Sequence, residues 1–179
     1  MPGAIKINYL MSPFGELLLG EFEGSLCLCD WRYRKMRNTI DNRVKAGLQA
    51  EYIEQTSPII DETKLQLNEY FKGIRKKFDI PLLLVGTDFQ KSVWQALMQI
   101  PWGDTETYLG LSNMLENEKA IRAVASANGA NAISIIIPCH RIIGGDGRLV
   151  GYAGGLATKS KLLKLENAIK TTQLDLFEG

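Results

Sequence analysis

The N-terminal part of the chain alternates apolar and polar positions with a period of two, as half-buried β-strands do. The alternation marks three segments, residues 4–9, 16–21 and 26–31. Two turn sequences separate them, Ser12-Pro13-Phe14-Gly15 and Glu23-Gly24-Ser25. We therefore expect a short antiparallel sheet at the start of the chain.

Further along, the period changes to that of an amphipathic helix. The apolar positions that share one helical face are Leu65, Leu67, Tyr70 and Phe71. The helix is expected to be capped either near Ser57-Pro58 or at Asp61, and to close around Gly73. Residues 81–85 are either a brief apolar strand or an extended linker. With a boundary at Gly86, residues 1–85 are predicted to form a small α/β cap domain.

The pattern after Gly86 is mainly helical. A first helix, capped by Thr87 or Asp88, presents an apolar face made of Val93, Trp94, Leu97 and Ile100. Two shorter helices follow, at 107–115 and 119–128, joined by a polar turn. Such a pair either forms a DNA-binding helix-turn-helix or simply packs a core. The expected fold is α+β, with domains at 1–85 and 86–170 and a tail at 171–179.

The best candidate for chemistry is Cys139, which follows the apolar run 133–137 and Pro138. That run should place the cysteine where a buried segment emerges towards a pocket. The thiolate is the reactive form of cysteine, so a base has to take the proton. His140, the single histidine of the chain, is adjacent. Neighbouring side chains in an extended segment point to opposite faces, so contact requires a turn or a bridging water.

A base of this kind needs a third group to orient it, preferably a carboxylate. Glu166 is the candidate, on a closing helix expected over residues 159–170 with leucines inward and lysines outward. The alternative is that Cys139 is a small buried hydrophobe. Cys27 and Cys29 are expected to be core-facing strand residues, because one spacer residue and no second histidine do not make a tetrahedral zinc set.

Composition bears on the cell compartment and the kind of partner, but it does not indicate a specific function. The chain has 179 residues, 45% of them hydrophobic, and no apolar run long enough to span a bilayer. Its three cysteines and the lack of a signal-like N-terminus favour the cytoplasm. The net charge is only +1, and residues 86–170 hold nine Lys and Arg against seven Asp and Glu. Any contact with nucleic acid must therefore come from a local surface.

Pro138-Cys139-His140-Arg141 resembles the signature of the O6-alkylguanine-DNA alkyltransferases, also called methylated-DNA–protein-cysteine methyltransferases. The likeness continues, at the family's spacings, over most of residues 87–167. Its segments are 89–94, 100–103, Thr107-Tyr108, 120–124, Asn131, 137–144, 151–156 and Lys159 to Glu166. The N-terminal half is similar more loosely, through 12–15 and 67–73.

This resemblance implies direct repair, in which Cys139 attacks the alkyl carbon on guanine O6 and is used once per molecule. It implies that His140, acting through a water and oriented by Glu166, removes the thiol proton, while Tyr108 donates a proton at guanine N3. It implies no cofactor and no metal. The pocket residues that match the family are Trp94, Ile142, Tyr152, Ala153 and Gly154, with the Ala153 N–H near O6 and the carbonyls of Cys139 and Ile142 accepting from the exocyclic amine.

The implied partner is double-stranded DNA carrying O6-alkylguanine, bound by a monomer that flips the base out of the duplex. Arg122 matches the arginine that fills the gap in the stack, on a helix whose small residues suit a narrow minor groove. The DNA-binding residues carried over are Arg122, Ala123, Ala127, Asn131 and Arg141, with Asn131 also tying this helix to the active-site segment. Departures from the family's pattern are Ala125, Ala132 and Leu109-Gly110-Leu111, which affect packing and hinge rigidity.

The tail resembles the short peptide by which bacterial repair and replication proteins bind the sliding clamp. A polar anchor and apolar side chains would fill a groove as an extended peptide, through Gln173, Leu174, Leu176 and Phe177. The alternative is a tail that packs back on its own domain.

Two other functions fit parts of the pattern. A lesion-binding relative that flips the base without taking the alkyl group carries another residue at the position of Cys139. A cysteine hydrolase or acyltransferase built on Cys139, His140 and Glu166 would need an oxyanion hole and would turn over repeatedly. A thioether, by contrast, has no easy hydrolytic exit.

Overall fold

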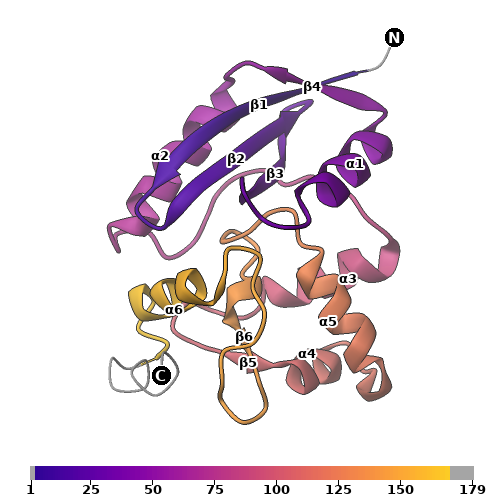
Figure 1. The fold of residues 1–179 in the computed structure, drawn as a ribbon, viewed down its shortest axis with the longest axis vertical. Coiled ribbons are helices and arrows are strands. Elements are labelled where there is room, and N and C mark those ends of the chain that lie inside the picture. Colours follow the sequence, from indigo (N-terminus) through magenta and orange to yellow (C-terminus); the bar gives the residue numbers. More distant parts are fainter. Residues whose placement is uncertain (1–2, 170–179) are drawn as a thin grey trace. The chain divides into compact units, whose positions relative to one another are not determined.

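The computed structural model describes residues 3–169, which divide into two compact units, one ending at Thr87 and the next beginning at Asp88 (Figure 1). The first unit is a sheet with two helices, and the second is mainly helical. The α+β class expected from the sequence is confirmed.

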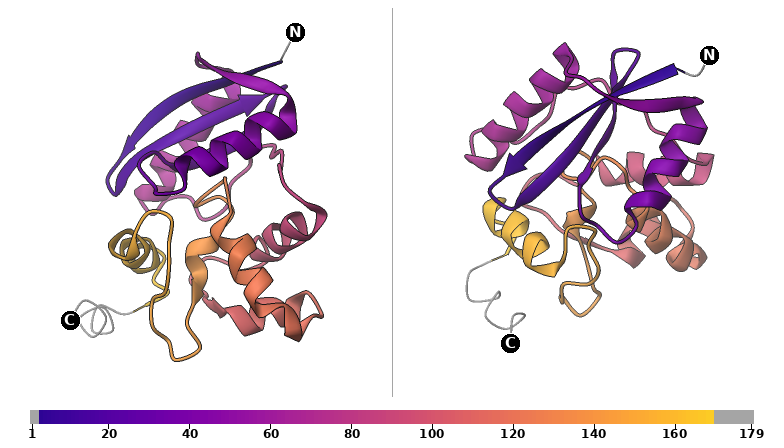
Figure 2. Two further views of the ribbon diagram at one scale, coloured as in Figure 1. Left: turned by 45° about the vertical axis from the view of Figure 1, so that its right-hand side comes forward. Right: turned by 45° about the horizontal axis from the view of Figure 1, so that its top comes forward.

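The first unit is built on a four-stranded sheet with the order β3-β2-β1-β4, and its strands lie side by side in both views of Figure 2. The antiparallel neighbours are β1 (Gly3–Ser12), β2 (Gly15–Phe22) and β3 (Ser25–Trp31). The three expected strands are therefore antiparallel as predicted, but β4 (Ala50–Glu54), which was not predicted, runs parallel to β1 and makes the sheet mixed. A parallel neighbour needs a crossover connection, and α1 (Arg37–Leu48) supplies it.

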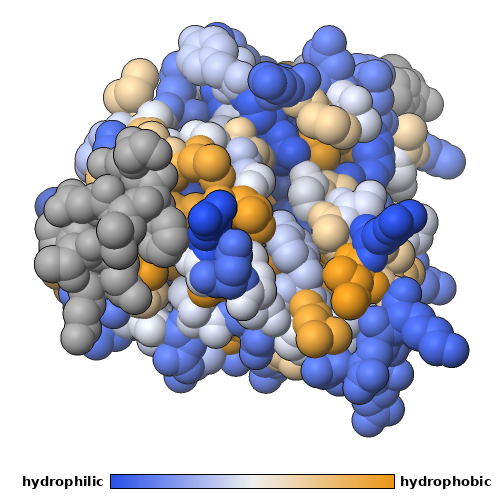
Figure 3. Space-filling view, turned by 60° about the horizontal axis from the view of Figure 1, so that its bottom comes forward, coloured by the Kyte–Doolittle hydropathy of each residue, from blue (hydrophilic) through white to orange (hydrophobic). Residues whose placement is uncertain are grey.

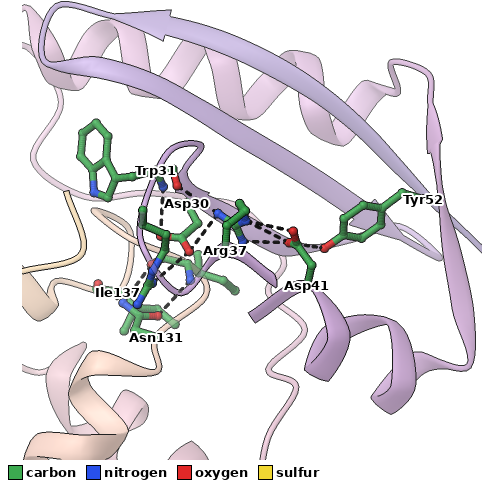
Figure 4. A network of polar contacts seen from close by, with 9 residues as sticks. Asp30, Trp31, Arg37, Asp41, Tyr52, Asn131 and Ile137 are labelled. Carbon is green, nitrogen blue, oxygen red and sulfur yellow. Dashed lines mark hydrogen bonds and ion pairs between the residues drawn. The ribbon is translucent and has the colours of Figure 1, made fainter. Parts of the chain in front are cut away.

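Polar contacts hold α1 against β3, which precedes it in the chain, and β4, which follows it. Arg37 on α1 pairs with Asp30 of β3 at 3.2 Å and with Asp41 at 2.9 Å. The hydroxyl of Tyr52 on β4 donates to Asp41 at 2.8 Å (Figure 4). The Asp30 carboxylate is fully buried, so these charge-assisted bonds compensate the cost of removing it from water.

The second helix of this unit, α2 (Pro58–Phe71), begins where its cap predicts. The Ser57 hydroxyl accepts from the Ile60 N–H at 3.2 Å, and Pro58 occupies the first turn, so Ser57 and not Asp61 is the cap. Residues 81–85 form no strand of their own. They make a single bridge, in which Leu82 lies beside Leu26.

The second unit packs three helices against one another, α3 (Asp88–Leu97), α4 (Tyr108–Met114) and α5 (Ile121–Gly129). A 3-10 turn, η1 (Glu118–Ala120), precedes α5. The helix expected over residues 119–128 therefore begins only at Ile121. Two short strands, β5 (Glu106–Thr107) and β6 (Ile142–Ile143), pair in parallel. Residues 144–155 form a long loop that leads into α6.

The closing helix, α6 (Leu156–Leu165), begins and ends earlier than the expected helix over residues 159–170. The side chains that it buries also differ at one position. Leu162 and Leu163 are buried as expected, but Lys159 is buried as well, so the prediction that the lysines point outward was wrong for this residue. Glu166 follows the last helical residue and caps the helix.

No helix within residues 3–169 is long and apolar enough to cross a membrane. The four tail residues predicted to bind a sliding clamp, Gln173, Leu174, Leu176 and Phe177, lie outside the described part of the chain.

Candidate active site

Cys139 opens a short 3-10 turn, η2 (Cys139–Arg141), at the end of the apolar run. Its N–H donates to the Ile137 carbonyl at 2.8 Å, and the thiol residue is 4% exposed. In a turn with three residues per revolution, successive side chains are not forced to opposite faces as they are in a strand. The turn therefore allows the side chains of Cys139 and His140 to approach each other, which they could not do in an extended segment.

A buried amide braces the segment that leads into this turn. The Asn131 side chain donates to the Ile137 carbonyl at 2.9 Å and accepts from the Ile133 N–H at 2.9 Å (Figure 4). Between those two anchors, Ile135 lies at φ +73°, and the Ile136 N–H bonds the Ser134 carbonyl at 2.9 Å. A β-branched residue at positive φ in a three-residue turn is strained, by about 1–3 kcal/mol. Asn131 thus holds a conformation that the local sequence disfavours.

The expected pairing of His140 with Glu166 is present. His140 Nε2 lies 2.7 Å from Glu166 Oε2, and both side chains are completely buried. Burial by itself raises the pKa of Glu166, but the neighbouring His140 and the hydrogen bonds from His140 and Arg141 lower it to about 2. The carboxylate is therefore charged at neutral pH and accepts a hydrogen bond from His140 Nε2.

Arg141 completes this group instead of facing outward. Its Nε donates to Glu166 Oε1 at 2.7 Å, its Nη2 to Glu166 Oε2 at 3.2 Å, and its Nη1 to the Ile100 carbonyl at 2.5 Å. The residue is buried. The structure therefore differs from the expectation that Arg141 contacts DNA, because its donors hold the Glu166 carboxylate and the backbone that follows α3.

The other ring nitrogen of His140 is the one left for chemistry. Because a carboxylate only accepts hydrogen bonds, Nε2 facing Glu166 carries the ring proton, and Nδ1 is the basic nitrogen. Nδ1 is buried and has no hydrogen-bond partner among residues 3–169. A buried acceptor without a partner is uncommon, and at this position it suits an atom that accepts a proton from the adjacent thiol, directly or through a water.

Tyr108 begins α4, where the Thr107 hydroxyl caps the helix by accepting from the Gly110 N–H at 3.0 Å. Burial, and secondarily the charge of Cys139, raises the pKa of Tyr108, while a side-chain hydrogen bond from Asn128 acts in the opposite direction. The phenol is thus protonated at neutral pH and close enough to sense Cys139. Gly110 leaves room for the Glu106 carboxylate, which a Cβ at that position would strike. This contact accounts for the glycine in Leu109-Gly110-Leu111.

Sequence reasoning matched Lys159 to the family but gave it no role in the site. Its ammonium donates to the Val150 carbonyl at 2.7 Å and to the Gly151 carbonyl at 3.3 Å, so it fixes the loop that carries the predicted pocket residues Tyr152, Ala153 and Gly154. Burial lowers the pKa of Lys159 to about 8, although Cys139 opposes that shift. The Tyr152 ring lies edge-on to the His140 ring, with centroids 6.3 Å apart.

The expected pocket and DNA residues divide into exposed and buried sets. Arg122 and Ala123 are exposed in the first turn of α5. Ala127, however, is buried, and its carbonyl accepts from the indole N–H of Trp94 at 2.8 Å. Trp94 is 2% exposed and Ile142 is fully buried. Trp94 and Ala127 therefore join α3 to α5 inside the unit, and their assignment to the base pocket and to the DNA-binding helix stays a prediction.

Comparison with known proteins agrees with this geometry. Residues 5–84 match the family model described as 6-O-methylguanine DNA methyltransferase, ribonuclease-like domain, and residues 88–168 match the DNA binding domain of the same family. The chain is 48% identical over 177 residues to the methylated-DNA–protein-cysteine methyltransferase of Mycobacterium leprae, covering 97% of this chain and 99% of that one. The corresponding protein of Methanosarcina barkeri is 46% identical over 159 residues, 89% of this chain and 95% of the relative.

Among solved structures, the fold is similar to Mycobacterium tuberculosis OGT in complex with DNA. The TM-score is 0.77 and the identity 35%, covering 97% of this chain and 99% of that chain. The resemblance seen in the sequence is thereby confirmed. The chain belongs to the O6-methylguanine DNA methyltransferase family.

Proposed function

We propose that the activity of this family, methyl transfer from O6-methylguanine in DNA to a protein cysteine, is carried out in this chain by Cys139. The observation that carries the proposal is the state of His140. One ring nitrogen is held at 2.7 Å by the fully buried Glu166, and the other is buried without a partner among residues 3–169. That arrangement equips the residue next to the thiol to take its proton.

The transfer then runs as a single displacement. His140 Nδ1 accepts the proton of the Cys139 thiol, and Glu166 stabilises the imidazolium that results. The sulfur attacks the methyl carbon, so that an S–C bond forms as the C–O6 bond breaks. Tyr108 gives its proton to guanine N3, so the base leaves neutral and not as an anion. The product at Cys139 is a thioether, and each molecule acts once.

The DNA surface that supports this proposal is the start of α5. Arg122 and Ala123 are exposed there, and Ser126 lies one turn further on, also exposed. A small-residue helix face with one arginine suits close approach to a minor groove, with Arg122 replacing the flipped base in the stack. The relative from M. tuberculosis that shares the fold is described in complex with DNA.

Apolar side chains contribute to the same surface. Figure 3 shows a face on which apolar patches lie among polar side chains. The exposed apolar residues of α4 and α5 are Leu109, Met114 and Ile121. With a net charge of only +1, we infer binding that depends on shape and stacking more than on neutralising phosphates.

A cytoplasmic monomer with a tail for the bacterial sliding clamp completes the proposal. The tail can be tested separately by deleting residues 173–179 and measuring affinity for the clamp. A large loss of affinity supports the interaction through Gln173, Leu174, Leu176 and Phe177, and unchanged affinity removes it.

The central test is mass spectrometry after incubation with a duplex that contains O6-methylguanine. A gain of one methyl group on the Cys139 peptide, at one equivalent per protein, is the expected result. Cys139→Ser should bind the duplex and gain nothing. An unmodified thiol after complete binding would overturn the proposal, and repeated turnover would favour the hydrolase or acyltransferase alternative.

A further inference from the structure

Asn128, near the C-terminal end of α5, is a buried polar residue that the mechanism above does not use. It is 6% exposed, and its side-chain oxygen has no hydrogen-bond partner among residues 3–169. Its side chain lies within hydrogen-bonding reach of the Tyr108 hydroxyl, close enough for the interaction to lower the pKa of that phenol. The two residues belong to α5 and α4, which pack against each other.

A purely structural role explains Asn128 poorly. Asparagine is less favourable in a helix than leucine or methionine, and a buried amide oxygen without a partner is costly. An apolar side chain would fill the same space without either disadvantage. The backbone around it is already fixed, because the indole of Trp94 bonds the Ala127 carbonyl at 2.8 Å. The amide is therefore available to act on Tyr108.

We propose that Asn128 is the positioning residue for Tyr108, with its amide N–H donating to the phenol oxygen. A phenol oxygen that accepts from Asn128 keeps its own proton free to point elsewhere, and guanine N3 is where the mechanism requires it. The same bond stabilises the oxygen after the proton has left. Asn128 thus orients the acid before the transfer and supports the phenolate after it. The inference rests on the proposed function, because it assigns a partner to the acid of that mechanism.

The surroundings of Tyr108 explain why such a partner is needed. Burial and the charge of Cys139 both raise the pKa of Tyr108, and the bond from Asn128 is the contribution that lowers it. An acid that is too weak transfers its proton late, so an interaction that favours the phenolate assists the reaction.

The test compares Asn128→Leu, Tyr108→Phe and the double variant in single-turnover methyl transfer to a duplex with O6-methylguanine. Loss of the acid should slow transfer at least about 100-fold. Loss of one hydrogen bond should slow it about five- to tenfold, with the affinity for the duplex unchanged. In the double variant Asn128→Leu should add nothing to Tyr108→Phe, because it acts only through the phenol. Asn113→Leu, the same change at an exposed position of α4, is the matched control and should transfer at the wild-type rate.

A second variant and a chemical rescue separate positioning from packing. Asn128→Asp keeps the size but replaces the donor with an anion, so it should be slower than Asn128→Leu. Replacing the six tyrosines with the more acidic 3-fluorotyrosine should bring Asn128→Leu back towards the wild-type rate, which a packing defect would not allow.

The outcomes distinguish this inference from the proposed function. If Tyr108→Phe is slow while Asn128→Leu matches the wild type, or if the two effects multiply in the double variant, the role of Asn128 is wrong and the mechanism stands. If Tyr108→Phe transfers at the wild-type rate, both the acid and its positioning residue are wrong. If the wild type gains no methyl group, the proposed function itself fails.

Discussion

Strand β3 and turn η2 both bury cysteines, but they surround the sulfur with different chemistry. Cys27 and Cys29 lie on β3 among fully buried leucines, and the Cys27 thiol donates to the Gly20 carbonyl at 3.6 Å. Cys139 is buried to nearly the same extent, yet the residue after it is paired with a buried carboxylate. Exposure alone therefore does not separate an inert thiol from a reactive one. The difference lies in which polar groups are buried with it.

The pKa values point the same way for the strand thiols. Burial is the main cause that raises the pKa of Cys27 to about 12, and it raises the pKa of Cys29 further. A cation beside the sulfur would oppose that effect, but the charged neighbours of Cys27 and Cys29 are the carboxylates of Glu21 and Asp30, which raise the two pKa values further. Around Cys139, by contrast, Tyr108 and Lys159 are both close enough for their pKa values to respond to its charge.

The largest expected effect is the difference in reactivity between these thiols. At pH 8, a pKa of about 12 in place of the ordinary 9 leaves about a thousandfold less thiolate at Cys27. Iodoacetamide added to the folded protein should therefore modify Cys139 and leave the strand cysteines intact, as read by peptide mass spectrometry over time. Labelling in denaturant, where all three should react, is the control. Similar rates for Cys27 and Cys139 in the folded protein would break the comparison.

The next effect concerns the carboxylate that distinguishes the two sites. Glu166→Gln removes the charge that stabilises the His140 imidazolium, so single-turnover methyl transfer should slow by about 100-fold or more. It also leaves Arg141 buried opposite a neutral group, which should lower the free energy of unfolding by about 3 kcal/mol. Urea unfolding measures the second effect.

Asp146→Asn is the matched control for that variant. Asp146 pairs with Arg148 at 3.5 Å, but both side chains are more than half exposed, so their pair is worth less than about 1 kcal/mol. The control should therefore unfold and transfer much like the wild type. A Glu166→Gln protein that transfers within twofold of the wild-type rate would show that His140 does not depend on the carboxylate.

Lys159 gives a pH signature that the strand site lacks. Its pKa is lowered by burial from 10.5 to about 8, so the folded protein binds fewer protons than the unfolded chain between those values. The Lys159 contribution to stability should therefore rise as the pH increases from about 8 to about 10.5, by an amount on the order of 2–3 kcal/mol. The raised pKa values of Cys27 and Cys29 act in the opposite direction above about pH 9, so the contribution is read as the difference between the wild type and Lys159→Met. Lys159→Met should lose that rise, whereas Lys164→Met, at an exposed position of the same helix, should keep it. Urea unfolding at pH 7.5 and pH 10 decides between them, and equal slopes in the wild type and Lys159→Met would contradict the assignment.

The sequence predicted the strands and helices that are marked by their own hydrophobic pattern or by a capping residue. Alternation located β1 to β3, and Ser57 with Pro58 located the start of α2. The crossover helix α1 and strand β4 were missed because α1 has no side-chain cap, and only Ile40 and Val44 are buried on it. Its position depends on the sheet it crosses. The parallel pairing of β4 follows from that crossover, which no local pattern reports.

The residues of the site also divide into those that the sequence predicted and those that depend on tertiary packing. The sequence picked out Cys139, His140 and Glu166 because a lone histidine beside a cysteine and a distant carboxylate form a recognisable set. It gave no role to Lys159 or Asn128, since a lysine in a lysine-rich helix and an asparagine near a helix end are usually solvated. Their burial comes from how η2 packs on α6 and α4 on α5, which is tertiary information.

The smallest effect tests the strand side of the comparison. Cys27→Ala and Cys29→Ala each remove one buried sulfur from an apolar strand, so each should lower the free energy of unfolding by about 1 kcal/mol. Methyl transfer should proceed at the wild-type rate in both, because burial and the neighbouring carboxylates of Glu21 and Asp30 keep these thiols protonated. The pair of measurements, unfolding in urea and single-turnover transfer, separates packing from chemistry. A slower transfer in Cys27→Ala would mean that the strand thiols contribute to the reaction. An unchanged rate with a small loss of stability would leave Cys139 as the thiol whose burial serves chemistry.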